Sequence, residues 1–162
     1  YDPETGFFFF TSNNAKGLVA RKMELTDNVI PASNSSMAKS LFLLGEFYYN
    51  EDYTKKSRQM LKNIEAQIPQ YISGYSNWGI LMLNNVKPFY ELAISGKKAH
   101  EKRREFNQNY IPNKLLVGSI KESNLPLLEM KEVNGSTMIY VCYNKACQLP
   151  VEEVSEALKQ IK

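Results

Sequence analysis

The sequence predicts a mixed α and β protein, with a β-hairpin and helical hairpins in residues 1–87 and a small α/β unit in residues 88–162. Two observations predict this fold class. Between residues 34 and 86, apolar residues recur at helical spacing, and short polar links separate the periodic segments. After Pro88 the pattern changes to a strand, a polar helix and a second strand, which is typical of a βαβ unit. We expect its sheet to have three strands and to be mainly parallel.

The first segment predicts the β-hairpin. Residues 7–12 are aromatic and β-prone, polar turn residues follow them, and residues 18–24 can form the second strand. The four consecutive phenylalanines at positions 7–10 favour burial, which is worth about 1.5–3 kcal/mol for each. We therefore expect other polypeptide to cover them, and we expect the sequence to be a fragment of a chain that extends upstream.

Three helices are expected next. The first begins at a cap, Asn34 or Ser35, and runs to about residue 49, because the side-chain oxygen of either residue can accept a free backbone N–H. Its apolar residues at helical spacing form one expected buried stripe, namely Met37, Leu41, Leu44 and Tyr48.

The second helix is expected to have Asp52 as its cap and to end at Pro69. The third begins at about Ser73 or Ser76 and runs to Val86. It is apolar nearly all round, which is typical of a helix that other helices bury.

In the second half, we expect strands at residues 89–95, 115–117 and 137–142, with a helix at residues 97–110 between the first two. A last helix starts near Pro150, with acidic residues in its first turn and lysines near its end, as the helix dipole favours.

Composition excludes some classes of function. Twenty basic residues face seventeen acidic ones, for a formal charge of +3, which is too mild for a nucleic-acid-binding surface. No apolar run approaches the roughly 20 residues that span a bilayer. We therefore expect no nucleic-acid partner and no membrane partner, and we expect a cytoplasmic, reducing setting.

Few residues suit metal or redox chemistry. Cys142 and Cys147 do not have the spacing of a Cys-x-x-Cys pair, and two thiolates do not complete a tetrahedral zinc site. Partly buried free thiols are the favoured state of the pair, and a disulfide that clamps the loop between them is the alternative. His100 is the only histidine. The turn at residues 96–98 lacks the pattern of a phosphate-binding loop. We expect no metal and no cofactor.

A polar group between the predicted hairpin and the first helix is the candidate site; its members are Arg21, Glu24, Asp27, Asn28 and Asn34. Carboxylates, amides and a guanidinium near aromatic residues suit the hydroxyl groups of a sugar, and glycoside hydrolysis uses paired carboxylates. The same residue types also serve as helix caps, turn residues and ion pairs, which is the competing interpretation.

Three segments carry a resemblance to a known family. Residues 1–11 read YDPETGFFFFT, residues 27–35 read DNVIPASNS, and residues 140–150 read YVCYNKACQLP. In this order and spacing they resemble the C-terminal third of the spermatogenesis-associated, thioredoxin-domain-containing proteins and their bacterial relatives. The chain has Ala32 and Ser33 where the family pattern has Ser and Gly.

The resemblance implies an upstream thioredoxin-like domain and an (α/α) toroid similar to six-hairpin glycosidases and N-acylglucosamine 2-epimerases, of which residues 1–87 would be a part. It places the residues that match the family's shared segment near the central cavity of the toroid, namely Arg21, Asp27, Asn28, Pro31, Asn34 and Ser35. It also favours a structural role for the two cysteines. On this basis Asp27 is the candidate acid or base, and Arg21, Asn28 and Asn34 are the candidate ligand-binding residues.

Two functions follow from the resemblance. In the first, the parent protein binds a carbohydrate and hydrolyses or epimerises it, and this fragment lacks a complete active site. In the second, the chain is a non-catalytic interaction module that supports a thioredoxin-like domain. In both, its partners are the upstream toroid and the thioredoxin-like domain of the same protein.

Overall fold

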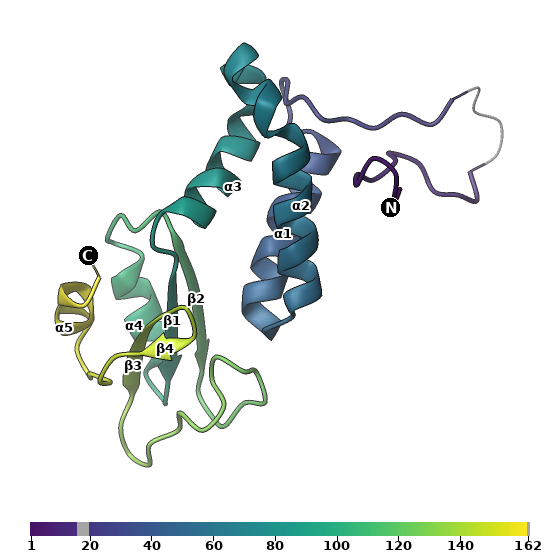
Figure 1. The fold of residues 1–162 in the computed structure, drawn as a ribbon. Helices are drawn as coiled ribbons and strands as arrows, with labels where there is room; N and C mark the ends of the chain where they lie inside the picture. Colours follow the sequence, from purple (N-terminus) through teal and green to yellow (C-terminus); the bar gives the residue numbers. More distant parts are fainter. Residues whose placement is uncertain (16–19, 162) are drawn as a thin grey trace. The chain divides into compact units, whose positions relative to one another are not determined.

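The computed structural model describes residues 1–15 and 20–161. The chain forms two compact units, Tyr1–Leu83 and Asn84–Lys162 (Figure 1). The described residues contain five α-helices and one four-stranded sheet, so the mixed fold class is confirmed. None of the helices in the described part of the chain is long and apolar enough to cross a membrane.

The first unit is built on an antiparallel pair of helices, α1 (Ser33–Tyr48) and α2 (Glu51–Ile64), which lie side by side (Figure 1). A left-handed residue, Tyr49 with φ 53°, ends α1. The next residue starts α2, because the Asn50 side chain accepts hydrogen bonds from two backbone N–H groups. The cap of α2 is therefore Asn50, and the prediction of Asp52 as its cap is wrong.

The contact between α1 and α2 uses small residues. A side chain at Gly45 would meet the Thr54 side chain at 2.4 Å, and the buried Ser57 hydroxyl donates to the Ala38 carbonyl at 2.7 Å. The predicted stripe of α1 is therefore wrong in three of its four positions. Close helix packing selects the small face, so among these four residues only Leu41 is buried and the others are exposed, namely Met37, Leu44 and Tyr48.

Two short 3₁₀ turns, Glu65–Gln70 and Ile72–Tyr75, lead from α2 to the third helix, α3 (Ser76–Val86). Trp78 and Leu81 of α3 are fully buried. Ile80 and Leu83 are each 50% exposed, so α3 is not covered on all sides in this structure, contrary to what its composition had predicted.

The predicted β-hairpin at residues 7–24 is not present in the part of it that the structure describes; Leu18 and Val19 lie outside the described residues. One backbone hydrogen bond links its two sides, from the Phe10 N–H to the Lys22 carbonyl. The backbone of Phe8 instead bonds to a side chain of α1, which removes it from any strand ladder. Phe7 is buried, whereas Phe10 is 63% exposed.

The second unit contains a sheet with strand order β2-β1-β3-β4. The strands are β1 (Tyr90–Ser95), β2 (Lys114–Ser119), β3 (Met138–Tyr143) and β4 (Ala146–Cys147). β1 and β2 pair in parallel through the crossover helix α4 (Ala99–Phe106), which confirms the βαβ prediction. The other two strand pairs are antiparallel, so the expectation of three mainly parallel strands is wrong.

The extra strand follows from a two-residue turn. Asn144 and Lys145 both have left-handed backbone angles, φ 51° and 64°. Successive left-handed residues make the turn that best matches the twist of a hairpin. The Asn-Lys pair lacks the glycine that usually marks such a turn, so no local pattern predicts a hairpin here.

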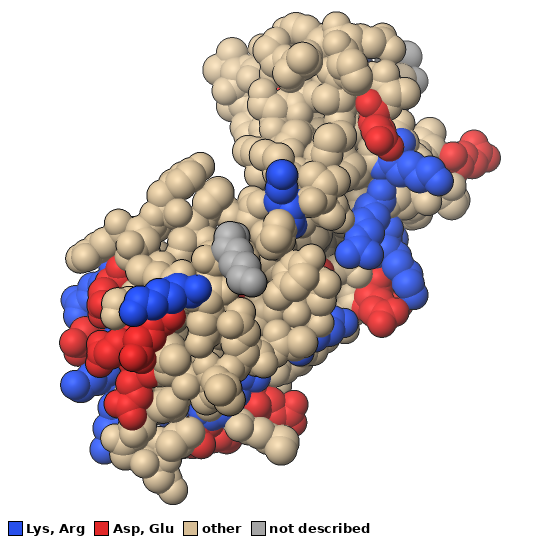
Figure 2. Space-filling model, turned by 60° about the vertical axis from the view of Figure 1, so that its left-hand side comes forward, with Lys and Arg blue, Asp and Glu red and all other residues tan. Residues whose placement is uncertain are grey.

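One face of this sheet packs on α4 and on α5 (Val154–Lys159). Leu92, Ile94, Ile139, Val141 and Phe106 are fully buried between these elements. The Lys102 ammonium of α4 lies 2.7 Å from the Glu153 carboxylate, just before α5. Figure 2 shows side chains of both charge signs next to one another on this face of the molecule.

Candidate functional site

Asp27, the predicted acid or base, lies buried at the starts of α1 and α3, with 6% of its surface exposed. Its Oδ1 accepts hydrogen bonds from the Ala32 backbone N–H at 2.9 Å and from the Ser35 hydroxyl at 2.7 Å. Its Oδ2 accepts a hydrogen bond from the Asn77 backbone N–H at 2.8 Å. A negative charge is favoured at helix starts, so this one carboxylate holds the beginnings of two helices together.

The pKa of the Asp27 carboxyl is lowered from its ordinary value of 3.8. Burial alone raises the pKa, and the hydrogen bonds from Ser35, Ala32 and Asn77 lower it by more than burial raises it. The carboxyl is therefore ionised at neutral pH. A general acid works best with a pKa near the working pH, which this environment does not provide.

The backbone around Asp27 is also fixed to α3 and to the turn before it. The Asp27 N–H donates to the Gly74 carbonyl at 2.7 Å. The indole N–H of Trp78 donates to the Leu25 carbonyl at 2.7 Å. A side chain at Gly74 would meet the Tyr71 ring at 2.3 Å, so the close approach of this ring favours glycine there. The segment that carries Asp27 is therefore held at its side chain and along its backbone.

Asn34 is fully buried in the first turn of α1 and bonds to two separate segments of the chain. Its amide oxygen accepts from the Phe8 N–H at 2.7 Å. Its amide nitrogen donates to the Phe8 carbonyl at 2.9 Å and to the Glu24 carbonyl at 3.0 Å. Both N–H donors of the amide thus have backbone partners, and the side chain acts as a substitute for a neighbouring strand.

Arg21 and Asn28 are exposed. The Arg21 guanidinium lies 3.9 Å from the centre of the Phe9 ring and donates to the Thr11 carbonyl at 2.8 Å. It lines an open hollow of about 490 Å³ whose other lining residues are Tyr1, Phe9, Phe10, Thr11, Ser12, Asn13 and Asn14.

The structure does not bring the four predicted site residues into one cavity. Arg21 lies at the hollow, Asn28 is exposed, and Asp27 and Asn34 are buried in separate hydrogen-bond networks. Ser35 and Asn77 complete the network of Asp27, and no spacing in the sequence marks them as its partners. No group of three or more His, Cys, Asp or Glu side chains that could hold a metal is found among the described residues.

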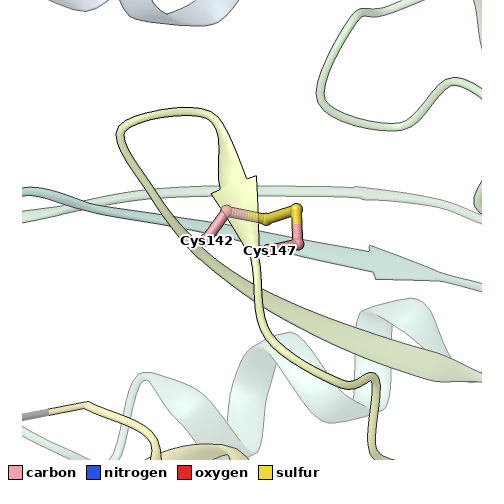
Figure 3. The surroundings of a disulfide bond; sticks show 2 residues. All are labelled: Cys142 and Cys147. Carbon is pink, nitrogen blue, oxygen red and sulfur yellow. A yellow bond between two sulfur atoms is a disulfide. The ribbon is translucent and has the colours of Figure 1, made fainter.

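The two cysteines form a disulfide between β3 and β4, with an S–S distance of 2.04 Å (Figure 3). The favoured expectation of free thiols is therefore wrong, and the alternative, a clamped loop, is the observed state. The disulfide was not the favoured expectation because no local pattern predicts the turn that brings Cys142 opposite Cys147.

Comparison with known proteins gives a distant relationship. The chain is 23% identical to human Spermatogenesis-associated protein 20 over 172 aligned positions. This alignment covers 95% of the chain and 21% of the human protein, so the chain spans about a fifth of the length of this relative. No protein-family profile matches the chain, and no solved structure matches it. The similarity agrees with the family resemblance seen in the three sequence segments.

Proposed function

We propose that this chain is a non-catalytic interaction module of a longer protein, in which it packs against further helices and supports a thioredoxin-like domain. The observation that carries this proposal is the state of Asp27. Its two carboxylate oxygens are occupied by one hydroxyl and two backbone N–H groups that belong to the starts of two helices. A carboxylate that fastens the fold in this way is a structural anchor.

The partner surfaces of this module are the exposed apolar sides of its helices. On α1, Leu43, Leu44 and Tyr48 are 40%, 42% and 54% exposed, and on α3, Ile80 and Leu83 are each 50% exposed. Contiguous exposed apolar side chains favour contact with other polypeptide. The proposed occupants are upstream helices of the same protein, arranged as the rest of an (α/α) toroid. The length of the human relative, about five times the aligned part, supports their existence.

The second candidate function is carbohydrate binding by the parent protein, and the hollow at Arg21 favours it. Its lining combines aromatic rings with a guanidinium and the side chains of Asn13 and Asn14. Such a lining offers a flat apolar surface and hydrogen-bond donors, which suit the two faces of a sugar ring. In this proposal, Arg21 at the hollow holds hydroxyl groups of the sugar, whereas Asp27 and Asn34, buried in separate hydrogen-bond networks, do not line the hollow.

Hydrogen exchange on the full-length protein tests the first proposal. We expect the Ile80→Asp variant to lose about 2 kcal/mol or more in free energy of unfolding, because it places a charge in a covered interface. Val29→Asp is the matched control, since Val29 is 96% exposed and lies outside any helix; it should change stability by less than about 0.5 kcal/mol. Equal small effects of both variants, with fast exchange across α3, would contradict the proposed packing.

A sugar-binding screen on the full-length protein tests the second. If the carbohydrate proposal holds, Arg21→Ala weakens binding at least tenfold without changing stability. If no sugar binds, and Asp27→Asn changes stability alone, the carbohydrate proposal fails and the interaction module remains.

A further inference from the structure

The tip of the β3–β4 hairpin carries the Cys142–Cys147 disulfide (Figure 3). The two cysteines are direct partners in the antiparallel register. The Gln148 N–H donates to the Val141 carbonyl at 2.9 Å, one position outside the pair. The cysteines themselves therefore occupy a non-hydrogen-bonded pair, where facing side chains come closest.

The two cysteines differ in accessibility. Cys142 is 1% exposed, whereas Cys147 is an exposed residue of the edge strand β4. Thiol–disulfide exchange requires that an incoming thiolate reaches one of the two sulfur atoms. Cys147 is the side of the bond that an incoming thiolate reaches.

The hairpin tip can open without disturbing the rest of the sheet. Beyond the tip, the chain is tied to β3 by hydrogen bonds between Ile139 and Val151, at 2.7 Å and 3.0 Å. The Gln148 side chain donates to the Gln160 carbonyl, and the Gln160 side chain donates to the Leu149 carbonyl. These bonds tie the chain that follows the tip to the end of α5. The disulfide closes a loop of only four residues, which is the class of loop that gains least from cross-linking.

The turn between the two cysteines is accessible. Asn144 and Lys145 both have left-handed backbone angles, φ 51° and 64°, and residues 143–146 are all exposed. Apolar residues on either side of the tip, Tyr143 and Leu149, are 46% and 83% exposed and give a partner protein a surface to contact.

We propose that the Cys142–Cys147 disulfide is an exchange site for a protein dithiol, which attacks the sulfur of Cys147. The thiolate of the partner forms a bond with Cys147 Sγ, and the bond between Cys147 and Cys142 breaks. The electron pair leaves on Cys142 Sγ, which takes a proton from water. The second thiol of the partner, after losing its proton, attacks the partner's own sulfur in the mixed disulfide and releases Cys147. Two electrons pass to this chain, and the partner leaves as a disulfide.

The test uses the oxidised full-length protein with thioredoxin, thioredoxin reductase and NADPH, and with glutathione at an equal thiol concentration. Alkylation of the two cysteines is followed by peptide-resolved mass spectrometry. We expect thioredoxin to reduce the bond at least tenfold faster than glutathione, with the far-ultraviolet circular dichroism unchanged. Alkylation of both cysteines before any reductant is added, equal rates with the two reductants, or global unfolding on reduction would each overturn the proposal.

Two further measurements identify the attacked sulfur and the contact surface. A thioredoxin whose second cysteine is replaced by serine should be trapped as a mixed disulfide on the Cys147 peptide; trapping on Cys142 would overturn the assignment. The Tyr143→Ser and Leu149→Ser variants should slow reduction by thioredoxin at least threefold and leave reduction by glutathione unchanged. An equal change with both reductants would refute the proposed contact surface.

Discussion

The two units of the chain form their backbone hydrogen bonds in different ways. In the first unit, two buried side chains bond to backbone groups: Asn34 of α1 bonds to the irregular segments before this helix, and Asp27 accepts hydrogen bonds from the starts of α1 and α3. In the second unit, the backbone of the strands pairs with itself along three ladders. Polar side chains of the first unit are therefore committed to structure, whereas the reactive disulfide of the second unit lies at the edge of an already paired sheet.

The largest expected effect comes from breaking the anchor of the first unit. Asp27→Ala leaves two backbone N–H groups without their acceptor and removes one of the two acceptors of the Ser35 hydroxyl, so we expect a loss of about 3–4 kcal/mol in free energy of unfolding. Urea denaturation measures it. Asp52→Ala, an exposed carboxylate on α2, is the control and should lose less than about 0.5 kcal/mol. Similar losses in the two variants would show that Asp27 does not anchor the fold.

The next largest effect is expected for Asn34→Ala, which should lose about 2–3 kcal/mol in free energy of unfolding, because the Phe8 N–H and two carbonyls lose a buried partner. Limited proteolysis should then cut within residues 1–15 earlier than in the unchanged protein. The exposed Asn28→Ala variant is the control for both measurements. An unchanged proteolysis pattern would show that other contacts hold this segment.

Replacing both cysteines by serine tests the second unit. We expect a loss of about 2 kcal/mol, the value for closing a loop of this length. Hydrogen exchange should increase at the hairpin tip and stay slow in β1, because the strand ladders do not depend on the disulfide. Exchange that increases throughout the sheet would indicate that the disulfide supports the whole unit.

A smaller effect is expected from pH. Because the pKa of Asp27 is lowered in the folded state, its stabilising contribution is fully present above 3.8 and is lost as pH falls through the folded pKa. The difference in free energy of unfolding between the unchanged protein and Asp27→Asn should therefore shrink with acidification below 3.8. A constant difference across this range would argue against an ionised anchor.

The smallest effect is expected at the ion pair between Lys102 and Glu153. The hydrogen bond from Lys102 and its positive charge lower the pKa of Glu153, whose carboxylate is solvent-exposed. Solvent and salt weaken such a pair. Lys102→Met should thus destabilise the protein less than Asp27→Ala, Asn34→Ala or the double cysteine variant, and sodium chloride should reduce the difference further. A salt-independent difference would show that packing of the lysine stem dominates.

The sequence determined the helices, the βαβ unit and the strand at residues 138–143, because periodicity and turn residues are local signals. Only the tertiary structure decided which face of α1 is buried, since the close approach at Gly45 outweighs the larger apolar stripe. It also decided that Asp27 and Asn34 bond to separate backbone segments and that Cys142 meets Cys147. Each of these features depends on a partner that is distant along the chain, or on a turn that lacks the usual turn residues. A local sequence pattern cannot predict either of them.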